Sequence, residues 1–276
     1  MILDEELTDL FGSVKKKYGY DFTEYAQASV MRRITHYMRA NKIASVQELQ
    51  KILLEDENTF SQFVMEFTVN VTEMFRDPSF YMSLRENVIK HLATYPVIKV
   101  WIAGCSTGEE VYSLAILLQE EGLLDRTVIY ATDINQRALN TAREGVYNMS
   151  QIKTYTSNYQ KAGGKKAFSE YYTAKYDAAM IDKSLKKHVV FSVHNLAVDG
   201  SFNEFQLIMC RNVLIYFNQS LQKKVINLFY NSLSPFGFLA LGNKESLLFS
   251  DKQQEFTSID KREKIYRKEN GSQRQR

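Results

Sequence analysis

"WIAGCSTGEEVYSLAI", Trp101 to Ile116, is the stretch that decides the fold of this 276-residue chain. The residues "VIKVW" that lead into it are β-branched and aromatic, which is typical of a strand. Apolar residues at 111, 114, 115 and 118 then recur at helical spacing, and Gly104 and Gly108 lie between the two patterns. The stretch therefore predicts a strand, a tight glycine turn and a helix, with room for a ligand at the turn.

The same alternation continues along the chain. A second strand is expected at 127–133 and a helix at 135–147, followed by strands at 188–196, 205–217 and 237–243, with a helix at 220–233. The segment "KIYRKE" at 264–269 is a candidate terminal strand. Strands separated by helices predict an α/β fold, with a parallel sheet covered by helices.

Residues 7 to 95 show a different, wholly helical pattern. Asp77 followed by Pro78 is typical of an N-cap and a first helical residue, so a connecting helix is expected to begin there. We expect an N-terminal helical domain and linker at 1–78 and a second domain at 79–268, with an insertion of one or two short strands at about 150–187. A polar tail is expected at 269–276.

Composition excludes several classes of protein. A net charge of +3 with a pI near 8.6 is too mild to indicate nucleic-acid binding. The N-terminus resembles no secretory signal and no apolar stretch is long enough to span a bilayer, so a cytoplasmic protein is expected. Cys105 and Cys210 each lie in an apolar, strand-like context, which predicts reduced, buried thiols and neither a disulfide nor a metal site.

The glycine spacing limits the class of ligand that the turn could bind. A dinucleotide fingerprint has a middle glycine that admits the pyrophosphate, and Gly104-x-x-x-Gly108 lacks it, which weakens a dehydrogenase interpretation. Asp133 at the end of the second strand could accept hydrogen bonds from two ribose hydroxyls, and S-adenosylmethionine is a nucleoside of suitable shape. The structural alternative is a plain tight turn, with Asp133 capping the next helix.

Polar residues in three other segments also indicate a ligand site. Asn70, Thr72 and Arg76 directly precede the α/β region, whereas "HNL" at 194–196 and "CRNVLIYF" at 210–217 follow predicted strands. The carboxyl ends of strands are where open α/β sheets bind ligands. Each of these residues alone also has a structural explanation, as does His194, to which we assign a structural role.

Six segments in this order resemble the CheR-type chemotaxis receptor methyltransferases. They are N-x-T-x-x-F-R at 70–76, "GCSTGEEVYSLA" at 104–115, "ATDIN" at 131–135, "HNL" at 194–196, "CRNVLIYF" at 210–217 and "LGNKESL" at 241–247. The resemblance covers nearly the whole chain. It implies a helical N-terminal domain, then a Rossmann-like S-adenosylmethionine-dependent methyltransferase domain with a small inserted β-subdomain.

The resemblance also implies roles for individual residues. Arg76 and Tyr216 would lie nearest the methyl transfer. The residues expected around the cofactor are Asn70, Thr72, Arg76, Gly104, one or both of Glu109 and Glu110, Asp133, Asn195, Leu196, Arg211 and Asn212. The family's acceptor is a glutamate side chain in the helical methylation region of membrane chemoreceptors, and the products are a glutamyl methyl ester and S-adenosylhomocysteine. No nucleic-acid partner and no insertion into the membrane are implied.

A glutamate acceptor agrees with the residues that are present. A carboxylate with a pKa of about 4.3 is already ionised at neutral pH, so it needs no general base, and the lack of an obvious catalytic His or Cys dyad is expected. Arg76 and Tyr216 can orient the acceptor carboxylate or the methionyl end of the cofactor. Which arginine serves which carboxylate is not readable from the sequence.

"SVMRRITHYMRANK" at 29–42 is a candidate docking helix. Val30, Ile34 and Tyr37 would form an apolar stripe, and Arg32 and Arg39 would fall on the opposite face with His36. A basic stripe suits an acidic receptor helix, and the alternative is a merely solvated face. For the whole chain, two alternatives stay open: a methyltransferase fold acting on another acceptor, or a cofactor-binding sensor.

Overall fold

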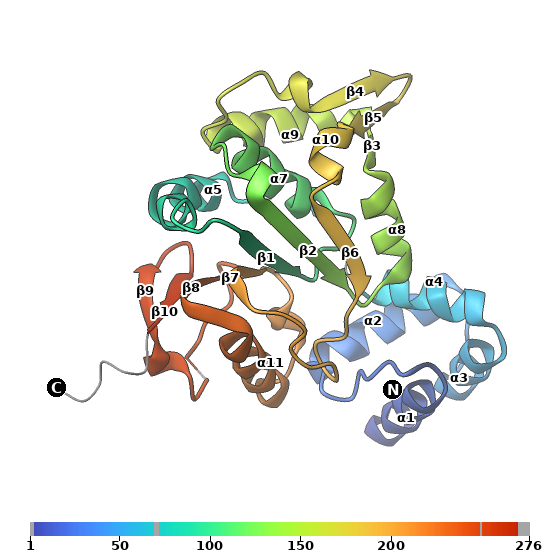
Figure 1. The fold of residues 1–276 in the computed structure, drawn as a ribbon. Coiled ribbons are helices and arrows are strands. Elements are labelled where there is room, and N and C mark those ends of the chain that lie inside the picture. The colour runs from blue at the N-terminus through green and yellow to red at the C-terminus, as the bar shows by residue number, and fades with distance from the viewer. Residues whose placement is uncertain (1–2, 69–71, 249, 270–276) are drawn as a thin grey trace.

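The computed structural model describes residues 3–68, 72–248 and 250–269. Four helices form the N-terminal region, α1 (Asp4–Tyr18), α2 (Gln27–Ala40), α3 (Val46–Glu55) and α4 (Glu57–Phe67). Their apolar stripes meet in a separate core that includes Leu10, Ile34 and Phe63, all fully buried. The predicted all-helical leading region is thus confirmed (Figure 1). None of the described helices is both long enough and apolar enough to cross a membrane.

A connecting helix begins at Pro78, as predicted. It runs as α5 (Pro78–Leu84), the π-helical turn η1 (Arg85–Ile89) and α6 (Lys90–Leu92). Asp77 is the N-cap residue, as predicted, although its side chain makes no cap hydrogen bond and its backbone is left-handed, with φ +57°. The Asp77 carboxylate accepts instead from Arg211 Nη2 at 2.8 Å, which ties the connector to the sheet.

The main sheet is mixed and has seven strands among the described residues, in the order β6-β2-β1-β7-β8-β10-β9. The first five run parallel, β10 is antiparallel to β8, and β9 is antiparallel to β10. The order reverses between β1 and β7, which opens a crevice at the carboxyl ends of these strands. The strands are β1 (Ile98–Ala103), β2 (Thr127–Asp133), β6 (Val189–Val193), β7 (Phe205–Cys210), β8 (Leu233–Leu241), β9 (Phe256–Asp260) and β10 (Ile265–Lys268).

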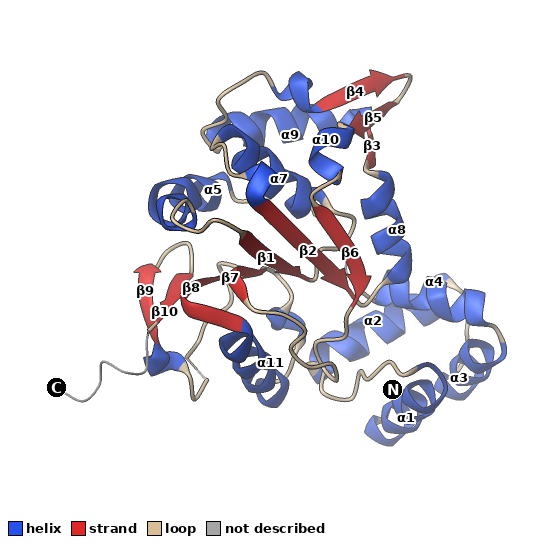
Figure 2. Ribbon diagram, in the orientation of Figure 1, coloured by secondary structure: helices blue, strands red, loops and turns tan. Residues whose placement is uncertain are grey.

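Helices cover both faces of this sheet (Figure 2), which confirms the predicted Rossmann-like α/β class. Alternate residues of β1 explain why: Val100 and Ile102 pack into the core with α7, whereas Trp101 and Ala103 pack with α11 on the other face. The helices here are α7 (Glu109–Glu120), α8 (Gln136–Glu144) and α11 (Gln219–Ser232), with the short turns η2 (Leu124–Arg126), η4 (Leu214–Tyr216) and η5 (Gln253–Glu255). The strand predicted at 205–217 ends at Cys210, and β9 had not been predicted.

The insertion is a small antiparallel sheet of order β3-β5-β4, with three strands rather than one or two. It comprises β3 (Val146–Asn148), α9 (Met149–Lys161), η3 (Phe168–Tyr171), β4 (Tyr172–Lys175), β5 (Ala178–Ile181) and α10 (Lys183–Lys186). The first strand precedes the boundary expected at 150. Glu120 of α7 anchors the insertion, because its buried carboxylate accepts from Tyr171 Oη and Lys165 N, each at 2.9 Å.

Replacing Gly108 tests the turn that starts α7. Its φ is +95°, and a Cβ there would lie 2.8 Å from Ala142 Cβ and 3.0 Å from Ala142 Cα. Gly122 is the matched control, because its φ is +67° but nothing lies within 4 Å of its added Cβ. We expect Gly108→Ala to lower the free energy of unfolding by about 3 kcal/mol and Gly122→Ala by about 1 kcal/mol, measured by urea denaturation. Equal losses would contradict the close approach of α8.

Candidate functional site

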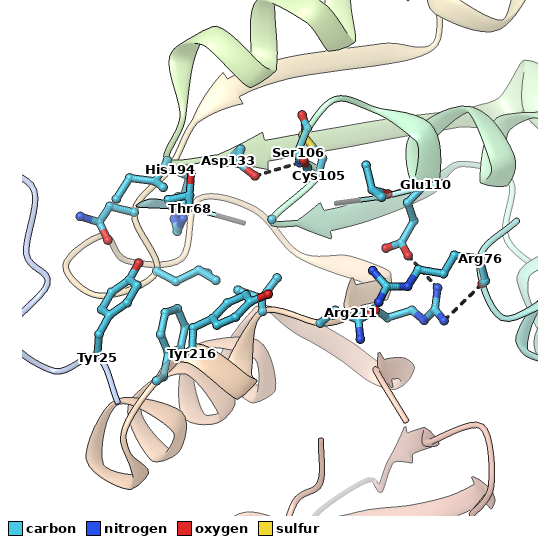
Figure 3. A pocket seen from close by; sticks show the side chains of 18 of the residues that line it. Tyr25, Thr68, Arg76, Cys105, Ser106, Glu110, Asp133, His194, Arg211 and Tyr216 are labelled. Carbon is cyan, nitrogen blue, oxygen red and sulfur yellow. Dashed lines mark hydrogen bonds and ion pairs between the residues drawn. The ribbon is translucent and has the colours of Figure 1, made fainter. Parts of the chain in front are cut away.

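A pocket of about 980 Å³, counting its open mouth, lies at the carboxyl ends of β1, β2, β6 and β7 (Figure 3). It therefore sits at the crevice that the strand order creates, which is where open α/β sheets bind ligands. The predicted residues that line it are Thr72, Arg76, Gly104, Glu110, Asp133, Asn195, Leu196, Arg211, Asn212 and Tyr216. Residues that the sequence analysis had not assigned to a ligand also line it: Tyr25, Arg33, Thr68, Cys105, Ser106, Ile134, His194, Val213 and Phe217.

The glycine turn brings β1 against the loop after β7. Gly104 has φ +81°, and a Cβ on it would lie only 2.4 Å from Val213 Cγ2. A side chain here would push the two loops apart, so Gly104 is needed for packing between strands as well as for the turn. Ser106 also has a positive φ, of +50°, and its N–H donates to Asp133 Oδ2 at 2.8 Å.

Asp133 is fixed at the end of β2 and is 8% exposed. Its Oδ1 accepts from Asn135 N at 2.8 Å. Burial raises the pKa of the Asp133 carboxyl, and the backbone N–H groups of Asn135 and Ser106 oppose that rise. The helix-capping alternative is wrong, because Asn135, not Asp133, is the N-cap of α8. Each carboxylate oxygen has two lone pairs, so Asp133 can accept further bonds from a ligand in the pocket.

Arg211 is almost fully buried and lies between two acids. Its Nη1 donates to Glu110 Oε2 and its Nη2 to Asp77 Oδ2, both at 2.8 Å, and its guanidinium lies 4.0 Å from the ring centroid of Phe80. Burial raises the pKa of the Glu110 carboxyl, and the charge of Arg211 opposes that rise. The positive charge of Arg211 is thus balanced within the protein.

The opposite wall comes from the helical domain. The Arg33 guanidinium lies 4.2 Å from the centroid of the Tyr216 ring, and its Nη1 donates to the carbonyl of Phe67 at 2.5 Å. Tyr25 packs edge-on against Phe217 with centroids 5.1 Å apart. Figure 3 shows Tyr25 and Tyr216 facing Asp133 and Ser106 across the cavity. The pocket is therefore lined by residues from both domains.

The remaining predicted residues are Glu109, the pair Arg32 and Arg39, and Asn70. The structure corrects the expectation for Glu109: its carboxylate does not line the pocket but accepts from Thr107 Oγ1 at 2.6 Å and faces Tyr155 of α9. Arg32 and Arg39 are exposed on α2, opposite the buried stripe, as the helical periodicity predicted. Asn70 lies outside the described residues.

The sequence held only partial signals for the unassigned residues. Cys105, Ser106 and Ile134 lie inside motifs already quoted, so their neighbours pointed to them. Arg33 follows Val30 by three residues and precedes Tyr37 by four, so an arginine within an apolar helical stripe was the available signal. Nothing in the sequence indicated Tyr25. His194, which also lines the pocket, packs edge-on against Trp101 and hydrogen-bonds the carbonyl of Gly200 at 3.1 Å.

A doubly wound sheet with a pocket at its switch point and an acid ending its second strand defines a nucleoside-binding α/β protein. Two family models match the chain, described as CheR methyltransferase, all-alpha domain, at residues 5–68, and CheR methyltransferase, SAM binding domain, at residues 70–265. The chain therefore belongs to the CheR methyltransferase family, which confirms the resemblance found in the sequence. S-adenosyl-L-methionine is its cofactor.

Individual relatives agree with this assignment. The protein Cher3 of Pseudomonas putida is 50% identical over 265 residues, which are 96% of this chain and 97% of that protein. A chemotaxis protein methyltransferase of Listeria innocua is 32% identical over 237 residues, 85% of this chain and 87% of its own. Among solved structures, the N-methyltransferase NodS of Bradyrhizobium japonicum has 13% identity and a TM-score of 0.41, covering 72% of this chain and 89% of that one, too slight a likeness to bear on this protein.

The pH dependence of stability tests the placement of Glu109. Burial raises the pKa of this carboxyl to about 7, so the folded state binds more protons than the unfolded state between about pH 4.5 and 7, and stability falls as pH rises through that window. Glu109→Gln removes the titration. We expect the free energy of unfolding of the variant minus that of the wild type to be larger at pH 8 than at pH 5 by up to about 3 kcal/mol, so the variant gains relative stability as pH rises.

Denaturant titrations at the two pH values provide this comparison, and fixed differences in packing between Glu and Gln cancel in it. The same variant should keep the wild-type affinity for S-adenosylhomocysteine, because the carboxylate faces away from the pocket. Parallel pH profiles, or a tenfold loss of affinity, would contradict the placement.

Proposed function

We propose that this protein transfers the methyl group of S-adenosyl-L-methionine to glutamate side chains of chemotaxis receptors, giving glutamyl methyl esters and S-adenosyl-L-homocysteine. The relatives named as chemotaxis protein methyltransferases support the receptor as substrate. The observation that carries the proposal is the make-up of the pocket: a buried acid at the end of β2 lies across from arginine and tyrosine side chains contributed by both domains.

The chemistry requires positioning more than proton transfer. When bound, the cofactor supplies a sulfonium whose methyl carbon is electrophilic. An acceptor carboxylate oxygen would form the new C–O bond as the C–S bond breaks and leaves its electron pair on sulfur, so no residue of the protein would have to move a proton. The protein's task is to exclude water and to hold the two reactants in line.

The buried charges suggest a division of roles among the arginines. Arg211 forms ion pairs with Glu110 and Asp77, so its charge is neutralised by the protein and holds the elements of the site together. Arg76 also lines the pocket, beside Glu110, and with Tyr216 it stays our candidate for orienting the acceptor carboxylate. Asn70, Thr72, Gly104, Glu110, Asp133, Asn195, Leu196, Arg211 and Asn212 remain the proposed surroundings of the cofactor; Glu109 is withdrawn.

We add Arg33 to the residues proposed to act on the acceptor, because its guanidinium stacks on the Tyr216 ring at the pocket wall. Burial lowers the pKa of its guanidinium and the neighbouring Tyr216 opposes that shift. An arginine remains charged in proteins, so Arg33 brings positive charge to the side of the pocket that the helical domain forms. An approaching glutamate would be attracted there, whereas a neutral hydroxyl or amine acceptor would gain less.

Docking of the receptor is assigned to α2. Arg32 and Arg39 are exposed on the same helix that carries Arg33 into the pocket, so a glutamate-rich receptor helix along α2 would lie next to the proposed transfer site. The methylation region of a chemoreceptor lies in the cytoplasm, which places the proposed activity there. The alternatives are another acceptor for the methyl group and a cofactor-binding sensor without transfer.

Transfer of labelled methyl to a receptor cytoplasmic fragment separates these alternatives. We expect label that mild alkali releases as volatile methanol, and loss of that label when the receptor glutamates are replaced by alanine. Stable label would indicate an amine or hydroxyl acceptor. Binding of S-adenosyl-L-methionine without any transfer would leave the sensor as the function.

Charge reversal on α2 tests the docking face. Because like charges repel an acidic partner, Arg32→Glu with Arg39→Glu should raise KM for the receptor fragment about tenfold and leave kcat within about twofold. Lys16→Glu with Lys161→Glu changes the net charge equally at exposed positions on α1 and α9 and is the matched control. Steady-state kinetics at low salt give both constants. An unchanged KM in the α2 variant, or the same rise in the control, would remove the docking role.

A further inference from the structure

The carboxylate of Glu245 collects backbone hydrogen bonds from the loop that follows β7. Glu245 is 4% exposed and lies in the turn after β8. Its Oε1 accepts from the N–H groups of Val213 at 2.8 Å and Ile215 at 3.3 Å. Its Oε2 accepts from Asn212 N at 3.1 Å and from Gly242 N at 2.6 Å. The methyltransferase motifs include this residue, yet Glu245 is not among the residues that line the pocket.

These N–H groups need such an acceptor because of where the strand ends. β7 stops at Cys210, so the residues after it have no neighbouring strand to satisfy their backbone. Asn212 is also left-handed, with φ +61°. An ionised carboxylate offers about four lone-pair directions and accepts strongly from N–H donors, and here four donors converge on it. One side chain therefore holds a loop that has no regular ladder of its own.

The neighbouring glycine lets the two loops come this close. A Cβ on Gly242 would lie 2.8 Å from Asn212 N and 2.8 Å from Glu245 Oε2. The other end of the loop is held by the helical domain, because Ala26 N donates to the carbonyl of Tyr216 at 2.8 Å and Asn218 N to that of Glu24 at 2.9 Å. The segment between Arg211 and Tyr216 is thus fixed from two sides.

We propose that Glu245 is a positioning residue for methyl transfer, which acts through the backbone of 212–215 to place Asn212 against the cofactor and Tyr216 against the acceptor. This inference rests on the proposed function. Replacing the carboxylate by an amide keeps the volume but leaves only one oxygen to accept, and turns an NH₂ group toward two N–H donors. The loop should then shift, and a displacement of about 1 Å at reacting groups lowers the rate about a hundredfold.

Glu245→Gln is therefore compared with Glu120→Gln. Glu120 is the matched control because its buried carboxylate also accepts from four donors, Arg85, Tyr159, Tyr171 and Lys165 N, but it lies outside the pocket. Both variants should lose thermal stability. We expect only Glu245→Gln to lower kcat for receptor methylation, about a hundredfold, and to weaken S-adenosylhomocysteine binding in calorimetry. Glu120→Gln should stay within about twofold of the wild type in both.

Gly242→Ala is the second variant, since it disturbs the contact between the Glu245 turn and the loop after β7 while the carboxylate stays intact. This variant provides the test if Glu245→Gln does not fold. Kinetics are measured well below the unfolding temperature of each variant. Equal activity of the folded Glu245 and Glu120 variants would overturn the proposal. The proposal would also be overturned if neither Glu245→Gln nor Gly242→Ala folds while Glu120→Gln does, because the role of Glu245 would then be structural. A wild type that binds cofactor but transfers nothing to receptor overturns the proposed function instead.

Discussion

The buried guanidinium of Arg211 is the interaction on which the rest of the site depends. Arg211 directly follows β7, and its two ion pairs reach Glu110 in the first turn of α7 and Asp77, which directly precedes α5. An unpaired charge in this buried position would destabilise the fold. Removing one partner of such a buried ion pair lowers the free energy of unfolding by about 3–5 kcal/mol, because the other charge stays buried and unpaired. The sheet, the first crossover helix and the connector from the helical domain are therefore locked together at one point, beside the pocket.

The remaining walls follow from that fixed corner. Gly104 can approach Val213 only because it has no side chain, and Ser106 binds Asp133 from the same turn. The helical domain then covers the open side through Tyr25 and Arg33. Each wall is held by hydrogen bonds or ring contacts to a different element, so the pocket is pre-formed.

Local sequence patterns predicted most of the fold and many of the residues that line the pocket. The strand, turn and helix around residues 101–116 were readable because β-branched residues, glycines and helical spacing follow one another there. The strand β9 was missed because "FTSID" is short and largely polar. Glu109 was misassigned because two adjacent acids on a helix point about 100° apart, and only packing against Tyr155 shows which one turns away from the cavity. Arg33 and Tyr25 reach the pocket through the docking of two domains, which no local pattern records.

The backbone pairing of residues 24–26 with 216–218 joins the segment preceding α2 to the loop that carries Tyr216. Residues from both sides of this interface line the pocket, so a molecule that filled it would favour the docked arrangement of the two domains. By mass action, its binding free energy is then added to the free energy that holds the domains together. In the proposed cofactor site, S-adenosyl-L-methionine would thus also be a ligand of the interface between the two domains.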